Sequence, residues 1–236
     1  DLLGANAAQR EKHARALRER VEELHAQLGV RLPVYVLVTK SDLLAGFTEF
    51  FADFDKDERA QVWGVTFPHA EDGGTEGPLA RLPGDLAALE KRLNDCLFER
   101  LQDEHDRERR AALYAFPQQW RVLNEALPEF LQGVFGAAAA AGQGPSPLLR
   151  GVYFTSATQE GAPIDRAIGG LPRSLGLARR IVPPARGGGK AFFVTRLLRE
   201  VVLGESGLAG TNLRWQRPRA WMGLGGLGLG GCVLVV

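Results

Sequence analysis

The chain has 236 residues, of which 45% are apolar and 24% charged, proportions that are ordinary for a globular protein. The formal net charge is only +1, so the protein as a whole has no electrostatic field that would recruit nucleic acid. Two cysteines and four histidines occur without the spacings that bind metal or build a disulfide framework. We therefore expect neither a metal site nor a dependence on disulfides.

The chain opens on an expected helix. Asn6 and Gln9 have the spacing of a capping box, which predicts a helix start. Apolar residues then recur four, three and four positions apart, at Leu17, Val21, Leu24 and Leu28. Such a stripe packs on a core, and it lasts too few heptads for the alternative, a coiled coil. Because the chain lacks an initiator methionine and enters this helix at once, we expect a strand of the same αβ unit before residue 1.

A buried strand is expected at 33–38, where Pro-Val-Tyr-Val-Leu-Val forms a continuous apolar run. The loop Thr39-Lys40-Ser41-Asp42 follows it, at the end of the strand where open α/β sheets hold ligands. This loop resembles the (N/T)-K-x-D element of GTPase-like P-loop proteins. In that element the carboxylate matched by Asp42 accepts two hydrogen bonds from a guanine edge, and the stem matched by Lys40 lies along the base. The alternative is a strand end with Asp42 as a helix N-cap.

A second strand is expected at 148–154, and it ends in Thr155-Ser156-Ala157. This tripeptide resembles the last base-contacting loop of the same GTPase-like fold, in which the backbone N–H at the alanine meets the base. Both loops stand behind an expected strand and in the order that the fold requires. The alternative for Thr155 and Ser156 is a turn whose hydroxyls satisfy backbone groups.

Between these two strands the first expected element is a short amphipathic helix. Its aromatic residues are Phe47, Phe50, Phe51 and Phe54. A cluster of this kind is more often part of the core than a binding platform. Residues 69–78, rich in Gly, Glu and Asp, are expected to form an exposed loop.

Two helices are expected after that loop. Leucine spacing predicts one helix from 85 to about 115, with the mixed-charge run 103–110 on its solvated face. Pro117 would close this helix and open the next. Residues 137–147 consist largely of Ala, Gly and Pro and are expected to be a linker.

Beyond Ala157, a Pro- and Gly-rich linker is expected at 181–190, followed by an amphipathic helix at 191–203 that covers the sheet edge. These expectations divide the chain into five parts. They are a first piece of an NTPase-like α/β domain at 1–68, a helical insertion at 69–147, a second piece of the α/β domain at 148–205, a basic juxtamembrane segment at 206–219 and the start of a transmembrane helix at 220–236.

The expected membrane segment has no charged residue from Ala220 to Val236. Interfacial and basic residues flank its start, namely Arg214, Trp215, Arg217, Arg219 and Trp221. Seventeen residues fall short of the ~20 needed to span a bilayer, so the helix would continue beyond the chain. The alternative is a Gly-rich tail. The segment from Arg173 to Arg219 contains ten Lys or Arg and only two Glu. This excess of positive charge suits an anionic lipid surface or nucleic acid.

Two glycine motifs do not fit their usual functions. Gly187-Gly188-Gly189-Lys190 lacks the first glycine and the Ser/Thr of a phosphate-binding loop, and the G-x-G-x-x-G at 223–228 has no strand before it. No complete G-x-x-x-x-G-K-[ST] occurs, so the chain by itself cannot grip a triphosphate and its Mg²⁺. No Ser/His/Asp or Cys/His pairing stands out, and we assign no catalytic residue.

Taken in order, four segments resemble the IcmF/TssM family of type VI secretion proteins. They are 31–47, 61–64, 151–161 and 207–212. The resemblance implies an inner-membrane protein with two N-terminal spans, a cytoplasmic NTPase-like domain, a third span and a large periplasmic part. This chain would be the second half of the cytoplasmic domain, with a partial P-loop GTPase-like parallel sheet, and residues 1–219 would be cytoplasmic.

The same resemblance implies a scaffold that works with TssL, the lipoprotein TssJ, baseplate components and further copies of itself. It places base contacts at Thr39, Lys40, Asp42, Ser156 and Ala157, with GTP or ATP and Mg²⁺ bound only by the full-length domain. Thr39 stands where most GTPases have an asparagine whose amide bridges to the phosphate loop. An active GTPase or ATPase switch and a basic nucleic-acid-binding module remain the alternative functions.

Overall fold

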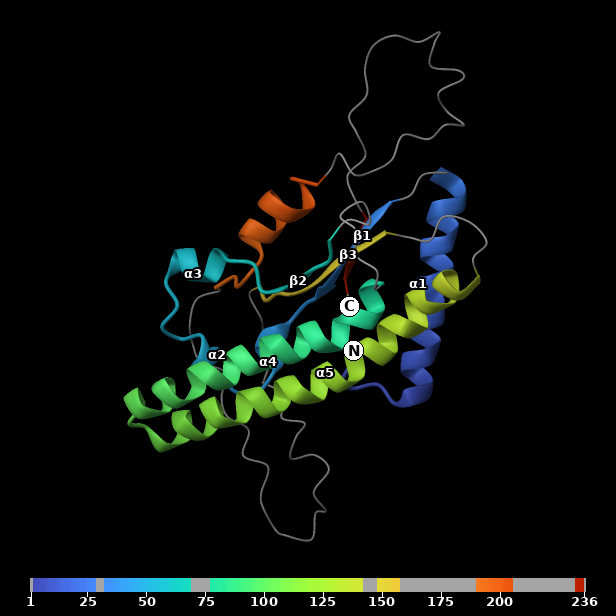
Figure 1. Ribbon diagram of the computed structural model, residues 1–236. Helices are drawn as coiled ribbons and strands as arrows, with labels where there is room; N and C mark the ends of the chain where they lie inside the picture. Colours follow the sequence, from blue (N-terminus) through green and yellow to red (C-terminus); the bar gives the residue numbers. More distant parts are fainter. Residues whose placement is uncertain are drawn as a thin grey trace.

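Two parallel strands, β1 (Pro33–Val38) and β3 (Leu148–Phe154), form the centre of the sheet in the computed structural model (Figure 1). The structure describes residues 2–28, 32–68, 77–141, 148–157, 190–205 and 232–235. The other elements are α1 (Ala7–Leu28), the 3-10 turn η1 (Ser41–Leu43), α2 (Phe47–Phe50), α3 (Lys56–Ala60), β2 (Gly64–Thr66), α4 (Pro78–Asp103), α5 (Arg107–Ala141), the π-helix η4 (Leu197–Val202) and β4 (Cys232–Val235).

The strand order is β2-β3-β1-β4, with β1 parallel to both of its neighbours and β2 antiparallel to β3. The α/β class and the parallel pair of long strands are therefore confirmed. The expectation of a wholly parallel sheet is wrong at β2. This short strand reaches the edge of β3 through Gly64, where an added Cβ would collide with the carbonyl oxygen of Val152. A sheet of the complete P-loop GTPase type stays a prediction.

The structure also corrects the expectation for the last residues of the chain. Cys232–Val235 are a strand, not a helix, and they pair in parallel with β1 from Val34 to Leu37. Valine favours extended backbone, and the free edge of β1 offers the hydrogen bonds of a ladder. Among the helices that the structure describes, none combines the length and apolar character needed to cross a bilayer. The predicted anchors at 214–221 lie outside the described residues.

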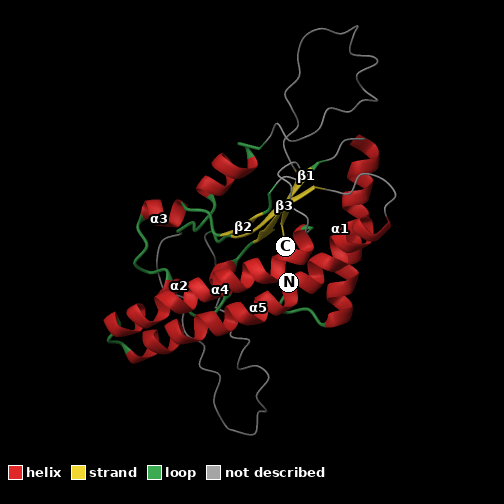
Figure 2. Cartoon of the chain, viewed as in Figure 1, coloured by secondary structure: helices red, strands yellow, loops and turns green. Residues whose placement is uncertain are grey.

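Between β2 and β3 the chain forms a long helical hairpin, α4 and α5, that lies beside the sheet (Figure 2). The boundary expected near residue 115 is wrong, because α4 ends within the mixed-charge run. Asp106 accepts hydrogen bonds from the backbone N–H groups of Glu108 and Arg109, at 2.8 and 2.9 Å, and so starts α5. Pro117 lies inside α5. This helix also continues to Ala141, into the expected linker, since alanine is the best helix former.

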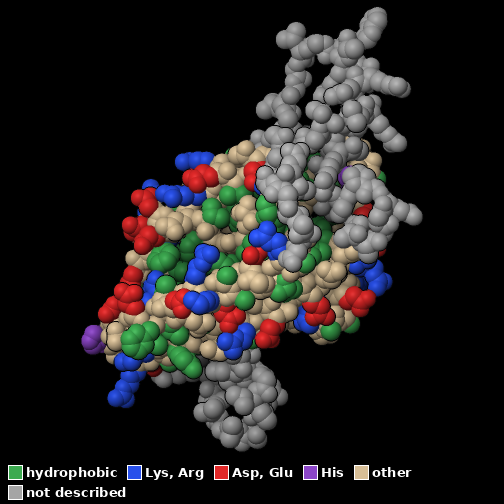
Figure 3. Space-filling model, in the orientation of Figure 1, with side chains coloured by type: hydrophobic (Ala, Val, Ile, Leu, Met, Phe, Trp, Pro, Cys, Tyr) green, Lys and Arg blue, Asp and Glu red, His purple; other side chains and the backbone are tan. Residues whose placement is uncertain are grey.

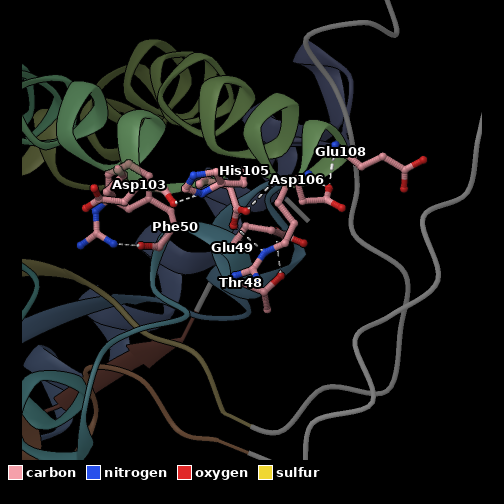
Figure 4. A network of polar contacts seen from close by, with 10 residues as sticks. Thr48, Glu49, Phe50, Asp103, His105, Asp106 and Glu108 are labelled. Atoms are coloured by element: carbon pink, nitrogen blue, oxygen red, sulfur yellow. Dashed lines mark hydrogen bonds and ion pairs between the residues drawn. The ribbon is translucent and has the colours of Figure 1, made fainter.

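The turn of this hairpin lies beside α2, as Figure 4 shows for Asp103, His105 and Asp106 next to Thr48 and Glu49. Arg100 strengthens the contact, because its guanidinium donates to the backbone oxygen of Phe50 at 2.6 Å. Residues 105–110 are exposed, as expected for a solvated face. Figure 3 shows Lys/Arg and Asp/Glu side chains interspersed on the visible surface.

The main core fills the face of the sheet that carries Val36, Val152 and Phe154. The expected aromatic core is confirmed, since Phe47, Phe50 and Phe51 are at most 4% exposed. Trp120 of α5 stacks on Trp63 with ring centroids 4.5 Å apart. Gly46 enables α2 to pack closely on α5, because it has φ +84° and an added Cβ would collide with the backbone of Ala112.

A smaller cluster covers the opposite face of the sheet. Tyr35, Leu37 and Tyr153 point there and are covered by Leu197 and Val202 of η4. The helix expected at 191–203 therefore exists in a shorter form, and it covers a face of the sheet and not its edge. Alternation along β1 explains the division, because successive side chains of a strand point to opposite faces.

Candidate functional site

The two predicted loops meet at one edge of the sheet. Because β1 and β3 are parallel neighbours, their carboxyl ends lie side by side. The backbone N–H of Ser41 donates to the oxygen of Thr155 at 3.1 Å, and the N–H of Thr155 donates to the oxygen of Val38 at 2.9 Å. The structure thus brings Thr39-Lys40-Ser41-Asp42 and Thr155-Ser156-Ala157 into direct contact.

Lys40 gives the first loop its shape. It has φ 60°, in the left-handed region that non-glycine residues rarely adopt, and its side chain is exposed. Lys40 occupies the N-cap position of η1 without a side-chain cap, and Asp42 lies in the first turn. The alternative interpretation of Asp42 as an N-cap is therefore wrong, and its carboxylate is available for another contact.

The Asp42 carboxylate lies between the loops. Its side chain accepts a hydrogen bond from Ser156, while burial raises the pKa of the carboxyl group above its usual value. The bond from Ser156, a backbone bond of Asp42 itself and the charge of Lys40 oppose that rise. Oδ1 of Asp42 is buried and has no hydrogen-bond partner among the described residues, and an acceptor of this kind is costly to leave unpaired.

Ser156 holds the second loop in place. It is buried, with 2% exposure, and its backbone pairs with Phe192 in both directions, at 3.0 and 2.8 Å. Its hydroxyl bonds Asp42 in the other loop, which differs from the alternative of a hydroxyl that serves its own turn. Ala157 is exposed next to it, and Thr39 is half-buried.

The groups at this edge could contact a flat polar ring. An unpaired carboxylate oxygen at Asp42 can accept a hydrogen bond from a ring N–H or an amino group, and the stem of Lys40 can cover a flat ring. All five predicted base contacts lie on these two adjacent loops, although their role in binding stays a prediction. Among the described residues, no cluster of three or more His, Cys, Asp or Glu could hold a metal ion.

A second polar group, on the other side of the sheet, was missed by sequence reasoning. Arg150 lies at a bulge of β3, since Val34 pairs with Leu149 and Tyr35 already with Gly151. Its buried guanidinium donates to both carboxylate oxygens of Glu205, at 2.9 and 2.7 Å, and to the oxygen of Phe67 at 2.7 Å. The one available signal was a charged residue inside the apolar run Leu-Leu-Arg-Gly-Val.

Comparison with known proteins covers nearly the whole chain. Residues 1–230 match the IcmF-related N-terminal domain. Over 227 residues the chain is 50% identical to the type VI secretion system component TssM1 of Pseudomonas aeruginosa (strain PAO1), a match that covers 96% of this chain and 20% of that protein. It therefore spans about a fifth of the length of this curated relative. No solved structure matches. These matches confirm the resemblance found in the sequence, and the chain belongs to the IcmF-related family, in the region of its N-terminal domain.

Proposed function

We propose that the chain is the cytoplasmic NTPase-like part of a type VI secretion membrane-complex component and that it acts there as a scaffold. The observation that carries this proposal is the 50% identity to TssM1 over 96% of the chain. A match of this length supports a role shared with TssM1 for nearly the whole chain. The rigid core of α4, α5 and the sheet suits a structural role, because it fixes the outer surfaces relative to one another.

In this proposal the complete protein stands in the inner membrane, and residues 1–219 lie on the cytoplasmic side together with Cys232–Val235, which belong to the same sheet. TssL, TssJ, baseplate components and further copies of the protein are its partners. The residues Arg214, Trp215, Arg217, Arg219 and Trp221 would lie at the lipid surface, since arginines meet anionic headgroups and tryptophans favour the interface.

A chimaera tests the scaffold proposal. Residues 1–230 replace the matching segment of TssM1 in Pseudomonas aeruginosa, and type VI secretion is measured by the export of its substrates. We expect secretion to remain, because the two segments share half of their residues and should therefore have the same fold. Deletion of the same segment is the control and should abolish export. A chimaera that accumulates in the membrane to the normal level but exports nothing would contradict the proposal.

A second proposal concerns the two loops. We infer that they bind the base of a nucleotide whose phosphates are held by residues outside this chain. The unpaired Oδ1 of Asp42 next to Ser156 favours this inference. Fluorescent GTP and ATP analogues, with Mg²⁺, would be titrated onto the chimaera in detergent. We expect Asp42→Ala to weaken binding of one analogue by tenfold or more, in line with about 1.5–3 kcal/mol for a bond to a charged group.

Asp53→Ala is the matched control, because Asp53 is an exposed aspartate outside the two loops. Equal binding by the Asp42 and Asp53 variants would refute the base site and leave the scaffold proposal unchanged. Phosphate release from the same samples then separates a binding scaffold from an active GTPase or ATPase.

A further inference from the structure

The helical hairpin carries two large aromatic side chains on its outer surface. Phe98 of α4 and Tyr114 of α5 are 70% and 59% exposed. Every other leucine or phenylalanine of the two helices belongs to the main core or packs against it. A single exposed apolar residue is common on protein surfaces, so the meaning of this pair depends on whether its members lie together.

The two aromatic residues lie at the same level of the hairpin. Arg121 of α5 pairs with Glu90 of α4 at 2.9 Å, which fixes how the antiparallel helices align. Phe98 follows Glu90 by eight residues, about two turns toward the end of the hairpin. Tyr114 precedes Arg121 by seven residues, also about two turns in the same direction. Both exposed rings therefore border the solvent side of the seam between α4 and α5.

Two exposed arginines stand beside Tyr114. Arg107 and Arg110 precede it by seven and four residues, spacings that place side chains on one face of a helix. Neither arginine forms an ion pair within the described part of the chain. Arg109, between them in the sequence, does have a partner, because it pairs with Glu104 at 3.0 Å. The charges of the other two are therefore free to meet charges on another molecule.

The position of Arg107 and Arg110 is not explained by the stability of α5. They stand in its first turn, where the positive end of the helix dipole makes a cation unfavourable. Glu108, the carboxylate of the same turn, has a contact of its own. The helix end and the two guanidinium groups thus create a positive field next to two exposed rings. Aromatic residues and arginine are also the side chains that protein interfaces favour.

We name the surface formed by Phe98, Arg107, Arg110 and Tyr114 the hairpin face. Near the end of the hairpin, Figure 3 shows hydrophobic side chains with Lys or Arg side chains beside them. The face has a rigid base, because the inner sides of α4 and α5 are packed into the main core. A partner would therefore meet a surface whose shape is already formed, which lowers the cost of binding.

We propose that the hairpin face docks an acidic amphipathic helix of a protein partner, whose apolar side chains cover the two rings and whose carboxylates pair with the two arginines. A helix suits this site, because it can lie along the seam of two other helices and present apolar residues at i, i+3, i+4 and i+7. A carboxylate accepts two parallel hydrogen bonds from one guanidinium group. The docking needs no nucleotide. It rests on the scaffold proposal, in which the chain holds partner proteins.

Photo-crosslinking in cells tests the docking, with the TssM1 chimaera described above. Phe98 and, in a second strain, Tyr114 are replaced by the photo-crosslinking amino acid benzoylphenylalanine, and mass spectrometry identifies the peptide that each position captures. We expect both positions to capture one and the same segment, with acidic residues and with apolar residues at helical spacing. Leu203, which is 63% exposed on another part of the molecule, is the control position and should not capture that segment.

Charge reversal tests the role of the arginines in the same cells. Arg107→Glu together with Arg110→Glu should lower the yield of the cross-link at least tenfold, because carboxylates then face carboxylates. Lys12→Glu together with Arg15→Glu is the matched control, with the same spacing at exposed positions of α1. This control should change the yield by less than twofold.

Several outcomes would overturn the proposal. They are a captured segment without acidic residues, capture of a second copy of this chain, an unchanged yield after charge reversal, and no capture at all. Export measured in the same cells keeps the two proposals apart. A chimaera that exports normally but captures no acidic segment refutes the docking alone, whereas loss of export with the capture retained contradicts only the scaffold proposal.

Discussion

The two faces of the sheet are stabilised in different ways. The face under α4 and α5 is covered by a large apolar core in which Trp120 and Phe116 are fully buried. The face under η4 has a few apolar side chains around Tyr35 and depends on the ion pair between Arg150 and Glu205, which we call the clasp. Apolar burial is non-directional. The Glu205 carboxylate, in contrast, accepts two hydrogen bonds from Arg150 and one from Tyr35, and such bonds weaken once their geometry changes. The first face is therefore held mainly by apolar packing, and the second depends more on a few directional contacts.

The largest expected effect is on the apolar face. Trp120→Ala should lower the free energy of unfolding by about 3–5 kcal/mol, because it removes a fully buried ring and leaves a cavity. Urea unfolding followed by circular dichroism measures the change. Tyr114→Ala, at a 59% exposed position of the same helix, should change stability by no more than about 0.5 kcal/mol. A similar loss from both variants would show that α5 is not held by its inner face.

A smaller loss is expected at the clasp. Arg150→Met should destabilise the chain by about 3 kcal/mol, near the lower end for a broken buried pair, since Glu205 remains 22% exposed. The double variant Arg150→Met with Glu205→Leu should recover much of this loss, because no unpaired charge remains buried. Urea unfolding of the two single variants and of the double variant gives the coupling energy. Strictly additive losses would contradict a direct interaction.

A third variant removes one hydrogen bond from the clasp. Tyr35→Phe should cost about 1 kcal/mol at neutral pH. Burial, with the hydrogen bond and charge of Glu205, raises the pKa of Tyr35 well above its ordinary value of 10.0. Stability conferred by neutral Tyr35 is complete below that ordinary value and is lost as the pH rises above it, because the unfolded chain then ionises first. The variant should therefore lose less stability than the unaltered chain above pH 10.

The same titration with Tyr114→Phe is the control, since Tyr114 is exposed. Parallel stability curves for Tyr35→Phe and the unaltered chain at alkaline pH would contradict the assignment of the raised pKa to Tyr35.

The smallest effect is expected at the loop edge, and it has the opposite sign. Burial raises the pKa of Asp42, so the folded state disfavours its ionised form. This penalty is absent below the ordinary value of 3.8 and grows as the pH rises toward the folded pKa. Asp42→Asn should therefore raise the melting temperature slightly at pH 7 and leave it unchanged below pH 3.8. Asp53→Asn, at an exposed position outside the two loops, is the matched control. A loss of stability in Asp42→Asn would show that the carboxylate is structural.

Much of the apolar face could be predicted from the sequence. The runs 33–38 and 148–154 indicated buried strands, and the phenylalanines after Gly46 indicated a packed helix, because these patterns depend on neighbouring residues. The adjacency of the two loops followed from the parallel strands. The antiparallel β2 and the strand at 232–235 could not be predicted, since a short segment pairs with whichever edge is free.

The clasp could not be predicted from the sequence for a different reason. Arg150 and Glu205 are separated by 55 residues, and Glu205 and Tyr35 by 170, so no local spacing links them. A buried arginine always needs a partner, but the sequence offers many carboxylates and only the fold selects one. The turn of the helical hairpin was also misplaced, because Asp106 stands in a charged run where a cap and a solvated face look alike.

The bulge in β3 makes the charged member of the clasp an addition to the ladder. Val34 pairs with Leu149 and Tyr35 with Gly151, so Arg150 has no partner residue on β1. The residues on either side of it would keep their alternation between the two faces of the sheet if Arg150 were absent. A lineage could therefore gain or lose this residue by inserting or deleting a single codon, with no rearrangement of the hydrophobic pattern around it. A one-residue difference in length at this position would then distinguish relatives that have the Arg150–Glu205 ion pair from relatives that lack it.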